Sequence, residues 1–115
     1  MLPESGKRLR IYIGESDRYE GLSLSEWLVR KARKEELAGA TVLRGIEGFG
    51  AHSRIHTSKI LRLSEDLPIV VEIIDTGEKI EHFLDVIDGV IGEGLATVES
   101  LEVRFYRGGD DVSAD

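Results

Sequence analysis

The sequence predicts an α+β sandwich in which two helices cover one face of a four-stranded antiparallel sheet. Three observations support this fold. Apolar residues alternate with polar ones near both ends of the chain, two apolar stripes with helical spacing each follow a capping sequence, and a continuous apolar run lies between those stripes. The order is therefore β-α-β-β-α-β, the ferredoxin-like arrangement. A chain of 115 residues with 41% hydrophobic residues is expected to form a single domain over residues 1–115.

The first strand and the first helix are predicted between residues 8 and 39. Residues 8–14 alternate with a period of two, which is typical of a half-buried strand. Residues 15–22 are polar and are expected to form a loop. Ser23 then opens an S-x-x-E capping box. The helix that follows is expected to run to about Ala38, with Gly39 as its C-terminal cap.

The second strand and a long loop follow. Residues 41–49 begin with β-forming residues and are then interrupted by Gly45, which predicts a bulge or a close approach of another backbone. Residues 51–65 have weak periodicity, and we interpret them as a long, mobile loop that could hold a short helix. This loop is expected to contact a partner through its cationic residues, which are Arg54, His56, Lys59 and Arg62.

A central strand, a second helix and a last strand complete the predicted sheet. Residues 67–74 are apolar on both faces, as in a strand that is buried on both sides. Asp75 begins a second capping sequence before the clearest helical stripe of the chain, which stops at Gly92. The last strand is predicted over residues 96–106, and residues 108–115 are expected to form a polar tail.

The helix-free face of this sheet is expected to need a partner. It should carry Tyr12, Val70, Glu72 and Ile74, so it is partly apolar. An exposed surface of this kind favours association with other copies of the chain.

The composition excludes several classes of function. The net charge of -7 opposes binding to nucleic acid. The absence of cysteine excludes disulfides, zinc-thiolate sites and thiol catalysis. No apolar run reaches the length of a bilayer span and no signal peptide opens the chain, so a cytoplasmic location is expected. Asparagine and glutamine are also absent, a bias typical of thermophile proteins. No nucleophile motif or P-loop is present, so no catalytic residue is assigned and an enzyme is not expected.

Three segments could bind a ligand. Residues 45–50 contain three glycines that would let a ligand approach the backbone, although a bulged strand end explains them equally well. Residues 89–94 could form an anion-binding nest, but an ordinary helix C-cap and turn is the better interpretation. His52 and His56 could bind a metal if their segment is helical, whereas a solvated loop is the favoured interpretation.

The chain resembles the PII signalling proteins in several ordered motifs. The run Gly39-Ala40-Thr41-Val42 leading to Gly48-Phe49-Gly50 resembles their G-x-T-V and G-F-G, and residues 89–94 resemble their G-x-I-G-D-G. A closer resemblance is to a PII-like family labelled only as a domain of unknown function. That family is similar to this chain in T-V-L-R-G-I-E-G-F-G from Thr41 to Gly50, and also in R-I-H, D-L-P and E-K-I.

This resemblance implies a homotrimer that binds an adenine nucleotide between subunits and signals through a mobile loop to a transporter, a channel or an enzyme. One wall of the site would be the end of the second strand and the loop base, and the other would be the 89–94 loop with the C-terminal arginines. The nucleotide-binding residues that it implies are Thr41, Gly48, Phe49, Gly50, Ile74, Gly92 and Gly94, with Arg104 and Arg107 as phosphate partners.

Two departures from the PII pattern bear on the ligand. Leu95 stands where PII proteins usually have a lysine, and Ala51-His52 stands where they usually have Arg-Gln. These changes remove groups that hold phosphate, so AMP or ADP is expected in preference to ATP with magnesium. No cofactor is expected to be required. The alternative is a trimeric metal-responsive protein of the copper-tolerance kind, which would use His52 and His56.

Overall fold

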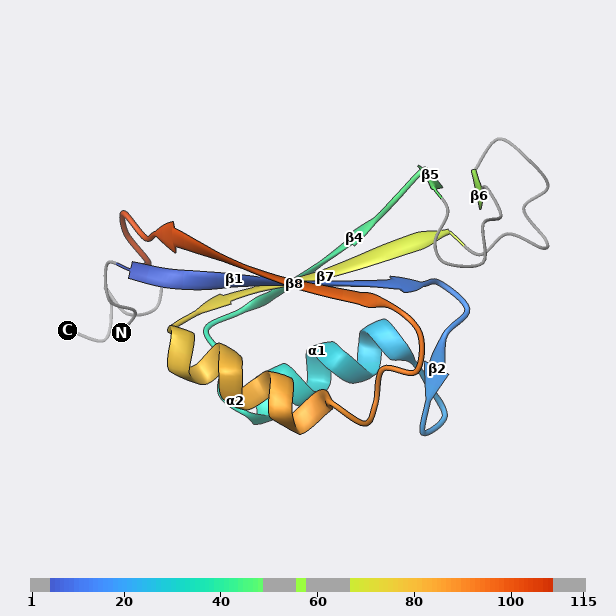
Figure 1. The fold of residues 1–115 in the computed structure, drawn as a ribbon, viewed down its shortest axis with the longest axis horizontal. Coiled ribbons are helices and arrows are strands. Elements are labelled where there is room, and N and C mark those ends of the chain that lie inside the picture. Colours follow the sequence, from blue (N-terminus) through green and yellow to red (C-terminus); the bar gives the residue numbers. More distant parts are fainter. Residues whose placement is uncertain (1–4, 49–55, 58–66, 109–115) are drawn as a thin grey trace.

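The structure is a computed structural model that describes residues 5–48, 56–57 and 67–108. In this part of the chain, four strands form one antiparallel sheet in the order β4-β7-β1-β8 (Figure 1). They are β1 (Ser5–Gly14), β4 (Ala40–Arg44), β7 (Pro68–Asp75) and β8 (Leu95–Glu102). The helices α1 (Leu24–Lys34) and α2 (Gly77–Ile87) both lie on one face of the sheet (Figure 1). The predicted ferredoxin-like α+β fold is therefore confirmed.

The hydrophobic core lies between the helices and the two central strands. Alternate residues of β1 and β7 point toward the helices and are buried, as the period-two pattern predicts for a half-buried strand. The core cluster consists of Leu9, Ile11, Ile13, Leu24, Leu28, Ala32, Ile69, Val71, Ile73, Ile80, Phe83 and Ile87. Burial of each large apolar side chain stabilises the fold by about 1.5–3 kcal/mol relative to leaving it exposed.

The opposite face of the sheet, called the open face below, has no helix over it in the described part of the chain. Tyr12, Val70, Glu72 and Ile74 alternate with the core residues and lie on this face, as predicted. They are only partly buried. The expectation that residues 67–74 are buried on both sides is therefore wrong for a single chain, because both helices cover the same face.

The C-terminus of α1 differs from the prediction. The helix ends at Lys34, and Glu36 rather than Gly39 adopts the left-handed conformation, with φ of 62°. The N–H of Glu36 donates to Arg33 O, and the N–H of Leu37 donates to Ala32 O, which satisfies the last helical carbonyls in the Schellman pattern. A glycine was expected at the turn because glycine adopts positive φ without steric cost.

The N-terminus of α2 also begins one residue later than predicted. Thr76 is the N-cap, and its hydroxyl accepts a hydrogen bond from the N–H of Lys79. Asp75 is instead buried at the end of β7, where its carboxylate accepts from Ala38 N at 2.8 Å and from Thr76 N at 2.6 Å. Asp75 therefore joins the segment before β4 to the start of α2. The helix itself stops at Ile87, before the predicted end.

Residues 15–22, expected to be a loop, contain a tight hairpin. The strands β2 (Arg18–Tyr19) and β3 (Leu22–Ser23) pair in an antiparallel manner. Their connection is Glu20 and Gly21, which both have positive φ, as a two-residue type I′ turn requires. Arg18 closes the hairpin by donating to Gly21 O at 2.7 Å.

The long loop predicted over residues 51–65 is described only at residues 56–57. There the backbone forms β6 (His56–Thr57), which pairs with β5 (Glu47–Gly48), so these two residues are extended rather than helical. The remaining residues of that loop lie outside the described residues. No helix in the described ranges is both long enough and apolar enough to cross a bilayer.

Candidate functional site

A cleft of about 540 Å³ lies where β8 ends and β4 begins. Residues 38–41, at the start of β4, form one side of it. Residues 101–106, at and beyond the end of β8, form the other side. Glu72 and Ile74 of β7 lie between them on the open face. The cleft therefore brings together three segments that are far apart in the sequence.

The segment that follows β8, residues 103–107, is called the C-terminal arm below. The sequence predicted that the last strand continues through Tyr106, but β8 stops at Glu102. Among the described residues, its partner β1 begins at Ser5, which pairs with Glu102. The arm instead reaches toward the opposite edge of the sheet, where Tyr106 Oη donates a hydrogen bond to Ala38 O at 2.6 Å.

The arm places aromatic and cationic side chains beside the cleft. Phe105 is 70% exposed and Tyr106 is 51% exposed. The Arg107 guanidinium lies over the Phe105 ring, 4.4 Å from its centre, and Arg104 Nη1 lies 3.3 Å from Glu102 Oε1. The contacts of both arginines are therefore with the arm or with the strand end beside it, and both remain close to the cleft.

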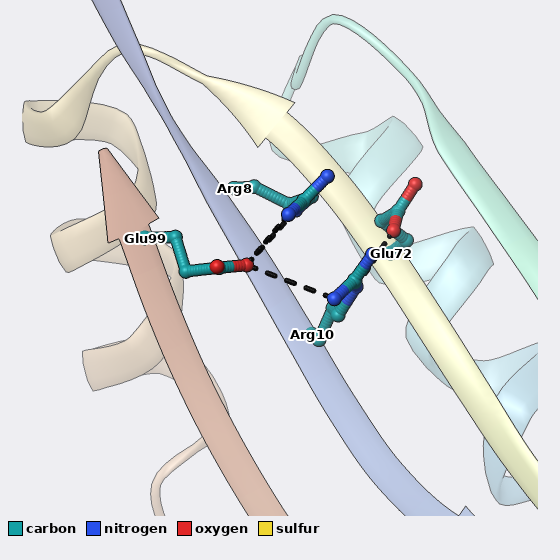
Figure 2. Close-up of polar contacts among 4 residues, drawn as sticks. All are labelled: Arg8, Arg10, Glu72 and Glu99. Atoms are coloured by element: carbon teal, nitrogen blue, oxygen red, sulfur yellow. Dashed lines mark hydrogen bonds and ion pairs between the residues drawn. The ribbon is translucent and has the colours of Figure 1, made fainter. Parts of the chain in front are cut away.

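A network of ion pairs occupies the open face next to the cleft (Figure 2). Arg8 Nη2 lies 2.7 Å from Glu99 Oε1, and Arg10 bridges two strands, with Nε 2.8 Å from Glu72 Oε2 and Nη1 3.7 Å from Glu99 Oε1. The hydrogen bond and the charge of Arg8 lower the pKa of Glu99, and the hydrogen bond that Arg10 donates to Glu72 raises the pKa of Arg10. Two cations and two anions thus neutralise one another, and one of them, Glu72, also lines the cleft.

The other end of the sheet is rich in glycine. Gly94 has φ of +154°, and a Cβ there would lie 2.7 Å from Tyr12 O. The N–H of Gly45 donates to Pro68 O at 2.7 Å and a Cβ on Gly45 would lie 2.6 Å from Pro68 Cγ, so another backbone approaches closely at this glycine. Tyr12 and Pro68 lie where β1 ends and β7 begins, so these glycines share one end of the sheet but lie at its two opposite edges.

The predicted nucleotide-binding residues fall into two groups. Thr41, Ile74 and Arg104 line the cleft, and Arg107 lies beside it on the C-terminal arm. The glycines of the predicted site lie at the other end of the sheet, and they are Gly48, Gly92 and Gly94. Phe49 and Gly50 lie outside the described residues.

Within one chain, the 89–94 loop and the C-terminal arginines of the predicted wall lie at opposite ends of β8. Gly94 precedes β8 and Arg104 follows it. The eight residues of β8, at about 3.4 Å each, place roughly 27 Å between the two ends of the strand. The two groups can meet in one site only if they come from different copies of the chain.

Sequence reasoning missed Tyr106, Glu72 and Ala38 as cleft residues. The sequence signal for Tyr106 was the run Arg104-Phe105-Tyr106-Arg107, in which two aromatic residues stand between two cations. That signal was assigned to a strand because the alternation of apolar residues continues through it. The contact with Ala38 depends on where the strand ends, which local periodicity does not indicate.

The described residues give no support to a metal site. No group of three or more metal-ligating side chains occurs among them. His52 lies outside the described residues, and the extended backbone at His56 does not provide the helix that the predicted pair required. The expected partner-binding residues Arg54, Lys59 and Arg62 also lie outside the described residues.

Comparison with known sequences identifies relatives of similar length. Residues 6–103 match the model of a family described as DUF190, Uncharacterized ACR. A UPF0166 protein of Aquifex aeolicus is 43% identical over 99 residues, which are 86% of this chain and 93% of that protein. A second UPF0166 protein, from Methanocaldococcus jannaschii, is 34% identical over 103 residues, covering 89% of this chain and 93% of its own length.

Comparison with solved structures identifies the same fold in PII-like proteins. CPII from Thiomonas intermedia, a nitrogen regulatory PII-like protein bound to ADP, AMP and bicarbonate, has a TM-score of 0.66 at 16% identity, covering 86% of this chain and 88% of its own. A putative PII-like signalling protein from Thermus thermophilus has a TM-score of 0.64 at 20% identity, covering 86% and 89%. CutA from Synechococcus elongatus has a TM-score of 0.57 at 10% identity, covering 90% and 80%. At these identities the likeness establishes the fold alone.

Proposed function

Because this chain belongs to the uncharacterised DUF190 family and has a PII-like fold, we propose that it is a regulatory protein that binds an adenine nucleotide between the subunits of a homotrimer. AMP or ADP is the preferred ligand. The protein signals nucleotide binding through residues 51–65 to a partner transporter, channel or enzyme. The observation that carries this proposal is the cleft, which gathers Thr41, Ile74 and Arg104 at one end of the sheet.

The cleft suits a planar, partly charged ligand. Its volume of about 540 Å³ falls within the roughly 300–1,000 Å³ that is usual for small-molecule sites. The Ile74 side chain and the exposed aromatic residues of the C-terminal arm offer apolar surface to a base. The Thr41 hydroxyl and the nearby backbone offer hydrogen bonds, and Arg104 offers a cation to a phosphate group. CPII, which has the same fold, was solved with ADP and AMP bound, which supports this class of ligand.

A small number of phosphates is favoured by the charge near the cleft. Arg104 and Arg107 are the cations of the C-terminal arm, and Glu72 and Glu102 place two anions along the same cleft. Leu95 adds no cation from the glycine-rich end of the sheet, where PII proteins usually have a lysine. The cations near the cleft would therefore neutralise the charge of a monophosphate or diphosphate more fully than that of a triphosphate.

A second copy of the chain supplies the glycine-rich wall that the cleft lacks. The glycines at the far end of the sheet cannot reach the cleft of their own chain, but they can reach the cleft of a neighbouring copy. The open face is the natural contact surface, since it carries Val70 and Ile74 without a covering helix. Its ion pairs are already balanced within one chain, which lowers the cost of burying them against another copy.

Calorimetry with adenosine, AMP, ADP and ATP with magnesium tests this proposal. Gly39→Val is the informative variant, because Gly39 lines the cleft and a Cβ there meets no protein atom within 4 Å. The added methyl groups should project into the ligand space and reduce nucleotide affinity at least tenfold, while leaving the melting temperature almost unchanged. Glu81→Val is the control, since Glu81 is exposed on α2, on the helix-covered side of the sheet and outside both groups of predicted site residues.

The expected order of affinity is AMP or ADP above ATP with magnesium. Normal binding by Glu81→Val together with weak binding by Gly39→Val would support the cleft as the site. A folded protein that gives no heat with any adenine nucleotide would refute the proposed function. Equal binding by the two variants would move the site away from this cleft.

A further inference from the structure

Among the described residues, a hydrogen bond of Tyr106 joins the far end of the C-terminal arm to the body of the protein. At its base, Val103 packs against Gly6 of β1, where a Cβ would come within 3.3 Å of Val103 Cγ2. Beyond Val103 the side chains are largely exposed, and Arg104 and Arg107 contact Glu102 and Phe105. The bond from Tyr106 Oη to Ala38 O is the contact that brings the arm to the opposite edge of the sheet.

The acceptor of this bond is itself fixed in place. The N–H of Ala38 donates to the buried carboxylate of Asp75, which also holds the first residue before α2. The Ala38 carbonyl is therefore a rigid anchor, whereas the arm is an irregular segment with no strand partner in the described residues. An irregular, exposed segment attached to a fixed one by an exposed hydrogen bond can exist in open and closed states.

We propose that Tyr106 is a positioning residue for Arg104. Its hydrogen bond to Ala38 O keeps the arm closed, and the closed arm holds Arg104 at the cleft, where it meets a phosphate group of the ligand. This inference deepens the proposed function and rests on it. Arg104 is paired with Glu102 at 3.3 Å in the present structure, and a phosphate group would take the place of that carboxylate.

The size of the effect follows from the nature of the bond. A neutral, partly exposed hydrogen bond shifts an equilibrium by about 2- to 12-fold. Loss of the Tyr106 hydroxyl should therefore lower the ratio of closed to open arm by a factor in this range, and the affinity for any ligand that needs Arg104 should fall by up to the same factor. A ligand without phosphate makes no use of Arg104 and should bind almost as well as before.

The experiment compares ADP with adenosine in four proteins: the unaltered chain, Tyr106→Phe, Arg104→Ala and the double variant. Tyr19→Phe is the matched control, because Tyr19 also loses only a hydroxyl and its ring packs edge-on against Trp27, away from the cleft. Affinity is measured by calorimetry. Amide hydrogen exchange of residues 103–107 in the ligand-free proteins reports the opening of the arm directly.

We expect Tyr106→Phe to weaken ADP binding measurably, by up to about 12-fold, to leave adenosine binding within about twofold and to speed exchange in the arm. In the Arg104→Ala background it should cause no further loss of ADP affinity, because the residue that it positions is gone.

Equal losses for ADP and adenosine would mean that Tyr106 only shapes the cleft, which would overturn the inference. ADP binding that is unaffected by Tyr106→Phe would overturn it as well and leave the proposed function intact. If the unaltered chain binds neither ligand, the proposed function fails and the inference fails with it.

Discussion

At the scale of single residues, Glu99 couples the open face to pH. The hydrogen bond and the positive charge of Arg8 lower its pKa below the ordinary value of 4.5. A carboxylate whose folded pKa is depressed contributes stability above its unfolded pKa, and that contribution is lost as the pH falls through the folded pKa. The free energy of unfolding should therefore decline below about pH 4.5, partly because of this side chain.

We predict that Glu99→Gln has a smaller decline between pH 5 and pH 2 than the unaltered chain, measured by urea unfolding at a series of pH values. The difference between the two proteins isolates Glu99 from the other carboxylates. Arg8→Ala provides the control, because it removes the main cause of the shift, so Glu99→Gln should have less effect in that background. Identical pH profiles for the unaltered chain and Glu99→Gln would contradict the prediction.

Residues of the candidate site were predictable from the sequence where a motif marked them. A short motif identified Thr41. Arg104 was identified because it is one of the nearest cations in the sequence to the predicted anion site. Both residues line the cleft. Tyr106 and Glu72 were not assigned to the site, because their roles depend on contacts across 68 residues and 62 residues of chain. No local pattern in the sequence contains that information.

At the scale of elements, the end of α1 shows how packing can override a local preference. Glu36 adopts φ of 62°, although glycine stands only three residues further on. Leu37 packs against the core and the N–H of Ala38 binds Asp75, so the chain must turn before Leu37. The Schellman pattern then falls on Glu36 because the buried contacts on either side fix its position.

Glu36→Gly should therefore stabilise the protein, by about 0.5–1 kcal/mol, since glycine removes the steric cost of the left-handed conformation. The hydrogen bond that Lys79 Nζ makes to Glu36 O uses the backbone and is retained. Lys34→Gly is the control, because it lies within the helix and should destabilise by up to about 1 kcal/mol. Thermal and urea unfolding measure both changes. A loss of stability in Glu36→Gly would show that the glutamate side chain has a role that outweighs the backbone strain.

The strands show the complementary limit of prediction from sequence. The alternation of β1 gave the correct core residues, because burial on one face imposes a period of two. The same alternation continues from Leu101 through Phe105, yet the chain leaves the sheet at Glu102. Pairing requires a partner strand, and within the described part of the chain β1 begins opposite Glu102. Periodicity therefore predicted which face a residue takes but not where the ladder ends.

At the scale of the whole molecule, the two groups of predicted site residues lie too far apart to form one site within one chain. The cleft holds Thr41, Ile74 and Arg104 at one end of the sheet, and the glycine-rich segments lie at the other. A closed, symmetric assembly solves this problem, because each copy can offer its cleft to the glycines of the next. The proposed ligand site and the proposed homotrimer therefore depend on the same contact surface.

That contact surface can be tested with one substitution. Val70 lies near the middle of the open face, paired with Tyr12 on one side and Leu43 on the other, and its side chain points away from the core. We predict that the unaltered chain sediments as a trimer at micromolar concentration and that Val70→Lys sediments as a folded monomer. A lysine there would bury an unpaired charge in the contact, whereas the monomer can leave it in water.

Glu81→Lys, on the exposed side of α2, is the control and should remain trimeric. A monomeric unaltered chain would refute the assembly, and a trimeric Val70→Lys would place the contact on another surface. Since the cleft needs a neighbouring copy, the monomeric variant should also lose nucleotide affinity, which links assembly and binding in one measurement.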